Sequence, residues 1–475
     1  MCIRDSSQLV LTLPVLLAHA LHGGPEPPAE APLLIHEWGT FTSLQDEEGR
    51  SLGWINTDDE PVPDFVHRIA CPILGPGDEV NLRFVKSVPR GHPDVTMRLE
   101  TPVVYFHPGP AHPDGTELDL TVEFRGGWLT EFFPQAEAEA PDFFRPRRTY
   151  PPLDGETVSR LTWPGLVLGG EPELPETDAG VWLAPRAVDS APVTAASGEA
   201  EQYLFYRGVG HLEAPLRVSR SPGGDELWIR SNLDLAIEEF DELQIAHLWL
   251  VDVRADGHTA WRRLDPLCIG MDHETVQGFV PALFDERDHS LEAGEALRAD
   301  LLAGLVEDGL FQDEAEGLLN TWEHAYFQTS GLRLFFLVPQ AWTDHYLPLE
   351  TSIPSRVVRT MVGRIELVSP EQRALLERLA AGPVSDNGWR TELLRWRAEN
   401  AERAAEAAER GQVLELPDLS DERPFAPEDW RAYLDLGRFR NALVLDALAR
   451  RPTPELAAFA GEYRLQGYTV KREEK

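Results

Sequence analysis

The chain has 475 residues, of which 42% are apolar, and its 80 acidic and 43 basic side chains give a formal net charge of -37 at pH 7. This length exceeds the size at which one hydrophobic core stops growing, so we expect two or three packed parts. The negative charge repels phosphate backbones and anionic headgroups, so nucleic acid is not an expected partner.

The first residues have the features of a secretory signal peptide. Residues 9–21 are mostly apolar and end in Ala18-His19-Ala20, an A-x-A-like cleavage site. We therefore predict a signal peptide over 1–20, a Gly- and Pro-rich linker over 21–32, and a location in the periplasm or outside the cell. Residues 1–6 resemble translated adapter sequence, which leaves the native start open. No other apolar run reaches the ~18 residues of a membrane-spanning helix, so no span is expected after cleavage.

From 31 to 290 the pattern is typical of short strands separated by Gly, Pro and Asp turns, and predicts an antiparallel, sandwich-like body. The clearest hairpin is expected over Glu117–Phe133, with its turn at Gly126-Gly127. Two further hairpins are expected around Gly223-Gly224 and Asp256-Gly257. Other strands are predicted over 33–43, 95–106, 180–183 and 202–207.

The apolar period changes near residue 290. Helices are predicted over 291–306 and 312–327 and strands over 332–338 and 356–367, so 291–368 is a mixed α/β segment. Ser369-Pro370 is a helix start signal that opens a helical region over 369–475. Its further helices are predicted over 389–410, 427–436, 438–450 and 454–463. The fold class is α+β overall.

Common catalytic motifs are missing from the sequence. There is no G-x-S-x-G elbow, no P-loop and no paired C-x-x-C. H-E-x-x-H is also missing, because Thr40 and Gln277 stand where a second His would follow His36-Glu37 and His273-Glu274. On a strand, His36 and Trp38 would share one face and Glu37 would point to the other.

Metal ligands could still come together from separate strands and loops of a β scaffold. We single out His36, His247 and His273 as candidate ligands of a divalent metal. The wider donor set adds Glu37, His67, Glu131, Asp272, Asp344 and His345. Spacing does not select three of these, and a hydrogen-bonded or solvated imidazole is the alternative for each histidine.

Glu37, Glu100 and Glu131 are candidate catalytic carboxylates, because apolar strands around a carboxyl raise its pKa toward that of a general acid. The alternative is a structural pair with a guanidinium such as that of Arg207. His36, Trp38 and Arg207 are candidate ligand-binding residues, since an exposed indole can stack on sugars or clamp peptides. For Trp38 the alternative is core packing.

Four segments resemble those of exported bacterial proteins that have no assigned function: His36-Glu37-Trp38-Gly39-Thr40-Phe41-Thr42 and the residues 100–106, 205–210 and 361–364. The resemblance covers most of the mature chain and implies only that His36, Glu37 and Arg207 are the first targets for mutation. We expect an exported, soluble binding or interaction protein with a glycan or peptide ligand. The alternative is a metal-assisted or carboxylate-based hydrolase with its site at the strand ends. A Cys71–Cys268 disulfide and the oligomeric state stay open.

Overall fold

The computed structural model describes most of the chain from residue 32 onward. The described residues are 32–55, 62–69, 91–140, 149–150, 152–232, 240, 243–269, 278–382, 428–463, 465 and 469–470. They belong to one unit, Pro32–Lys475. The predictions that fall outside them are the signal peptide over 1–20, the linker over 21–32 except its last residue, Cys71, Asp272, His273 and the helix over 389–410.

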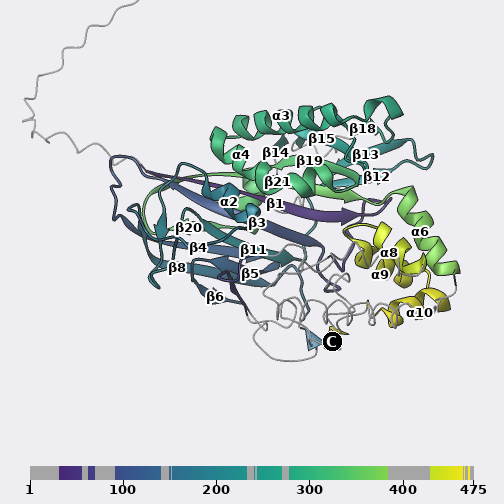
Figure 1. The fold of residues 1–475 in the computed structure, drawn as a ribbon, viewed down its shortest axis with the longest axis horizontal. Coiled ribbons are helices and arrows are strands. Elements are labelled where there is room, and N and C mark those ends of the chain that lie inside the picture. The colour runs from purple at the N-terminus through teal and green to yellow at the C-terminus, as the bar shows by residue number, and fades with distance from the viewer. Residues whose placement is uncertain are drawn as a thin grey trace, which may run out of the picture. The chain divides into compact units, whose positions relative to one another are not determined.

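A nine-stranded sheet is the largest among the described residues (Figure 1). In spatial order its strands are β16 (Thr259–Arg263), β15 (Leu248–Val253), β19 (Gly331–Val338), β21 (Ser355–Leu367), β1 (Leu33–Gln45), β3 (Met97–His107), β11 (Leu204–Gly210), β5 (Gly127–Phe133) and β2 (His67–Arg68). The pair β1–β21 is parallel, and all other neighbours are antiparallel. Two antiparallel halves are therefore joined at the parallel pair.

The middle of this sheet is covered on both faces. All but one of the residues of β1 are buried, and they include the polar residues His36, Glu37 and Gln45. β19 and β21, from the segment predicted as a separate mixed region, lie between β15 and β1. The division expected near residue 290 therefore does not separate two sheets.

A six-stranded sheet packs against one face of the large sheet. Its path is β10 (Ala200–Glu201), β9 (Val193–Thr194), β8 (Val158–Leu168), β4 (Glu117–Arg125) and β20 (Leu349–Thr351), and β6 (Glu137–Glu139) pairs with β8. Side chains from both sheets, such as Val104 of β3 and Leu120 of β4, belong to one hydrophobic core. A β-rich body with packed sheets was predicted, but β20 of this sheet comes from beyond the expected boundary at residue 290.

The hairpin predicted over Glu117–Phe133 is wrong, although both of its strands exist. β4 belongs to the six-stranded sheet and β5 to the nine-stranded one, so the turn at Gly126 carries the chain between sheets. Gly126 has φ +80°, and an ideal Cβ on Gly127 would lie 2.2 Å from the ring of Phe124. The chain therefore crosses between layers where only glycine fits.

Smaller sheets complete the strand inventory of the described residues. β12 (Leu216–Arg220), β13 (Glu226–Ser231) and β18 (Gly278–Pro281) form one sheet, β14 (Leu243–Ile245) pairs with β17 (Leu267–Ile269), and β7 (Thr149–Tyr150) pairs with β22 (Thr469–Val470). The hairpins β12–β13 and β15–β16 are confirmed, with φ +80° at Gly224 and +84° at Gly257 in their turns.

Helices cover the other face of the large sheet, and the helices late in the chain lie beside one end of it (Figure 1). α2 (Gly180–Arg186), α3 (Leu291–Glu307) and α4 (Gln312–Thr321) share a second core with Trp38, Tyr105 and Phe335 of the sheet. A π-helical turn (His324–Gln328) follows α4, and α5 (Gln340–Tyr346) precedes β20. The later helices are α6 (Pro370–Ala381), α8 (Glu428–Asp435), α9 (Arg440–Arg450) and α10 (Pro454–Glu462). The class is α+β, as predicted.

Two local predictions differ from the structure. Residues 180–183, predicted as a strand, begin α2, whose buried residues Trp182 and Pro185 lie three positions apart on one helical face. The helix predicted over 312–327 is α at its start and π-helical over its last turn. Every described helix is too short or too polar to cross a lipid bilayer.

Candidate metal centre

Three donor side chains come together where β1 and β3 meet α4. His36 lies on β1 opposite Tyr105 of β3, and His107 is two residues further along β3. Side chains two residues apart on a strand share a face, so His36 and His107 are diagonal neighbours beneath the helical layer. Glu314, in the first turn of α4, reaches them from above.

Glu314 contacts both imidazoles directly. His36 Nδ1 lies 2.7 Å from Glu314 Oε2, and His107 Nε2 lies 2.8 Å from Glu314 Oε1. One donor atom from each of the three residues lies within 4.8 Å of the other two, and no other group of three such donors occurs in the described ranges. The side chains are 2%, 13% and 0% exposed for His36, His107 and Glu314, so His107 is the one nearest to solvent.

The start of α4 holds the carboxylate in place. Glu314 stands at the third helical position, and its Oε2 accepts the backbone N–H of the N-cap residue Phe311 at 2.7 Å. Burial would raise the pKa of Glu314, but the hydrogen bonds from His107 and His36 outweigh it and lower the pKa to about 2. Glu314 is therefore a carboxylate at neutral pH, the form that ligates metals.

Phe311 covers the two histidines. Its ring centroid lies 4.6 Å from that of His36 and 4.8 Å from that of His107, and the two imidazole centroids are 5.0 Å apart. Phe311 itself is 44% exposed. An apolar ring thus separates the donors from bulk water and lowers the local dielectric around them.

The donor set matches that of zinc. Two imidazole nitrogens and one carboxylate oxygen are a known three-residue zinc set, with metal–ligand distances of about 2.0–2.2 Å. Tetrahedral geometry at those distances separates donor atoms by about 3.4 Å. The two nitrogen–oxygen contacts, which go to different oxygens of Glu314, are shorter than this separation, and the three donor atoms lie within 4.8 Å of one another, so binding a metal would require side-chain adjustments. Without metal, both imidazoles are hydrogen-bonded to the carboxylate.

Glu37 lies on the opposite face of β1, as the strand period predicts. Its Oε1 accepts the Tyr206 hydroxyl, and its Oε2 pairs with Arg359 Nε. Arg359 also donates from Nη1 to Asp344 Oδ1 at 3.1 Å and to the Leu347 carbonyl. Glu37 is fully buried and Arg359 is 2% exposed. The predicted catalytic carboxylate is thus the anion of a buried ion pair.

Glu100 is also bound to guanidinium groups. It pairs with Arg438 and Arg98 and accepts the Thr42 hydroxyl at 2.9 Å. Burial would raise the pKa of Glu100, but the nearby Arg438, Arg98 and Arg364 charges lower it below its ordinary value. A carboxyl held ionised in this way is a poor general acid at neutral pH.

Glu131 pairs with Arg207, its partner in the β5–β11 register, and with Arg68 Nε at 2.8 Å. Glu131 and Arg207, which were both predicted as site residues, therefore form an ion pair with each other. This is the structural pairing that was the alternative for Arg207.

The remaining candidates lie apart from the three donors. Trp38 is fully buried in the core under α3 and α4, so its indole is not available to stack on a ligand. His247 stacks on Trp249 at 5.8 Å, and its Nδ1 accepts from Arg263 at 2.7 Å. From the wider set, His67 pairs with Glu199 at 2.8 Å. Of the three predicted metal candidates, only His36 joins the cluster, and His273 lies outside the described residues.

Two of the three donors were not among the sequence candidates. His107 becomes visible only once the β1–β3 register is known, because nothing in its local sequence marks it. Glu314 occupies the third position of a capping box, but its N-cap is Phe311 and not Ser or Thr, so the usual sequence signature is absent.

Comparisons with known proteins do not assign the chain to a family. No protein-family model and no curated protein matches the chain. Among solved structures, the yeast delta-COP-I mu-homology domain complexed with a Dsl1 WxWxV peptide matches at 7% identity and a TM-score of 0.20. The match covers 72% of this chain and 98% of that one. Similarity this weak carries no argument about fold or function.

Proposed function

We propose that the protein is an exported metal-binding protein that holds one divalent transition-metal ion, zinc by its donor chemistry, through His36, His107 and Glu314. The observation that carries the proposal is the convergence of two imidazoles, one buried and one partly buried, on the buried carboxylate of Glu314. The N-terminal signal-peptide pattern supports export.

A metal-assisted hydrolase is the second candidate. Three protein ligands leave a fourth position for water or substrate, which is the arrangement of catalytic zinc, whereas structural sites use four protein ligands. The partial exposure of His107 supports an approach to that position from its side. A bound zinc ion would lower the pKa of its water ligand to about 7.

Metal content of the purified full chain tests the binding proposal. After incubation with zinc and removal of the excess, elemental analysis should find one equivalent per chain. His36→Ala and Glu314→Gln should lose it. Glu314→Gln keeps an oxygen to accept the Phe311 N–H, so the start of α4 is retained.

His289→Ala is the matched control. His289 pairs with Asp252 at 2.9 Å and its side chain is 2% exposed, as for His36, but it belongs to no three-donor group of the described residues. This variant should keep its metal. Metal-free wild-type protein, or equal metal content in His36→Ala, would contradict the proposal. Hydrolysis of a model ester that survives chelation would reject the second candidate alone.

A further inference from the structure

Phe311 contacts all three metal donors and is the exposed member of the group. Its ring centroid lies 4.6 Å from that of His36 and 4.8 Å from that of His107. Its backbone N lies 2.7 Å from Glu314 Oε2. The donor side chains are at most 13% exposed, whereas Phe311 is 44% exposed. The Phe311 ring therefore lies between the two imidazoles and solvent.

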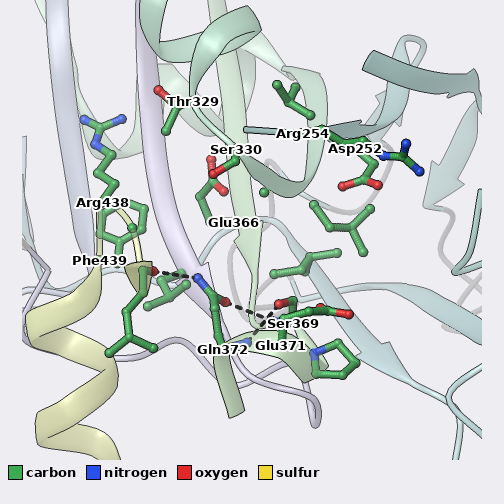
Figure 2. Close-up of a pocket in the computed structure, with 18 of the residues that line it drawn as sticks. Asp252, Arg254, Thr329, Ser330, Glu366, Ser369, Glu371, Gln372, Arg438 and Phe439 are labelled. Carbon is green, nitrogen blue, oxygen red and sulfur yellow. Dashed lines mark hydrogen bonds between the residues drawn. The ribbon is translucent and has the colours of Figure 1, made fainter. Parts of the chain in front are cut away.

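Other parts of the fold close the centre on its remaining sides. The sheet lies beneath it, because β1 is paired with β3 on one side and with β21 on the other. α4 closes the side of Glu314, whose side chain is fully buried. A cavity of about 380 Å³ lies elsewhere, among β15, β19, β21 and the start of α6 (Figure 2), and its lining includes none of the three donors. The donors are therefore not reached through that cavity.

The backbone of Phe311 is held at both of its polar groups. Its N–H donates to Glu314 Oε2, and its carbonyl accepts the Ala315 N–H at 3.0 Å in the first turn of α4. The residue before it, Leu310, is 3% exposed and belongs to the core under α3 and α4. Movement of the ring therefore comes from rotation about its own side-chain bonds, which leaves these hydrogen bonds intact.

Such a rotation breaks little packing, because almost half of the Phe311 side chain already faces solvent. Side chains at exposed positions change rotamer rapidly, whereas the strand and helix that carry the donors stay in place. We infer that the Phe311 side chain is the gate of the metal centre: it turns outward to let the ion enter or leave and otherwise covers the two histidines. This inference rests on the proposed metal binding.

A gate changes the rates of metal exchange and leaves the equilibrium as it is. The same opening precedes both entry and exit, so removing the ring should speed both by the same factor and leave the zinc affinity unchanged. A residue that only positions the ligands behaves differently, because its loss speeds release alone and weakens the affinity. Measuring both rates therefore distinguishes the two roles.

Stopped-flow measurements on the full chain at pH 7 test the inference, with uptake of zinc from a fluorescent zinc indicator and release of zinc to an excess of a chromogenic chelator. Phe311→Ala should take up and release zinc about tenfold faster than the wild type, because opening no longer uncovers about half of an aromatic side chain. Phe311→Leu keeps a smaller apolar cover and should give rates between the two. Leu291→Ala is the matched control: Leu291 begins α3 and is 57% exposed, and this variant should exchange zinc like the wild type.

Elemental analysis of the same samples separates this inference from the proposed function. If the wild type holds no zinc, the metal-binding proposal fails and the gate fails with it. If the wild type and Phe311→Ala each hold one equivalent and exchange it at equal rates, the gate alone is wrong. Loss of zinc from Phe311→Ala at equilibrium, or faster release without faster uptake, would also overturn the gate and assign Phe311 to positioning the ligands.

Discussion

The ion pair between Glu37 and Arg359 allows a sharp test of whether Glu37 is structural. Neither residue is more than 2% exposed, so Glu37→Gln leaves a buried guanidinium without its main counter-charge. Breaking one side of a buried pair costs about 3–5 kcal/mol. We expect the lower end of that range, about 3 kcal/mol, because Asp344 and the Leu347 carbonyl still accept from Arg359 and glutamine can still accept from Tyr206.

A double-mutant cycle separates the pair from its surroundings. Arg359→Met alone should also be strongly destabilising, because it leaves Glu37 buried as an unpaired anion. Combined with Glu37→Gln, it removes both charges, so the double variant should be more stable than the sum of the single effects predicts, by about 2 kcal/mol.

The assay is equilibrium unfolding in urea at pH 7, followed by tryptophan fluorescence and far-UV circular dichroism. The control is Glu286→Gln, which removes an exposed partner of Arg254 and should leave the midpoint unchanged. A loss below about 1 kcal/mol in Glu37→Gln, or strict additivity in the cycle, would refute the structural assignment and return Glu37 to the list of catalytic candidates.

Two further predictions concern packing and acid stability. Gly363→Ala should lower the unfolding free energy by about 1–3 kcal/mol, because the added Cβ would lie 2.1 Å from the Phe336 ring. Gly461→Ala is the control: it lies in open space on α10 and should stabilise the protein by about 0.5–1 kcal/mol. Equal urea midpoints for the two variants would contradict this. Glu100 and Asp46 both have a lowered pKa in the fold, since their arginine partners outweigh the effect of burial. The stability they contribute is present above their ordinary pKa values of 4.5 and 3.8 and is lost as the pH falls further, so urea midpoints should drop below about pH 4.5. A flat profile down to pH 3 would show that these pairs contribute nothing.

Local signals predicted many elements well, because those elements depend on neighbouring residues. Ser369 caps α6 by accepting the Gln372 N–H, as the Ser-Pro start signal predicts. The turn at Asp256-Gly257 joins β15 and β16 for the same local reason. The strand face of His36, opposite to that of Glu37, also followed from the period of two alone.

Sheet membership could not be predicted from such signals. In the structure β4 alternates between buried and more exposed residues, whereas β5 is buried throughout, so the two strands lie in different environments. Which strands pair depends on contacts between residues far apart in the chain. The metal donors show the same limit, since Glu314 meets His36 across 278 positions and no local pattern encodes that approach.

The parallel pairing of β1 with β21 has a consequence for the order of folding. Leu33 is matched with Ser355, so the first described strand finds this neighbour only after more than three hundred further residues have been synthesised. Closing so long a loop is slow, whereas each antiparallel half of the sheet can assemble from nearer segments. Until then one side of β1 offers free backbone groups to any other strand, so this seam is where a nascent chain is most exposed to mispairing and aggregation.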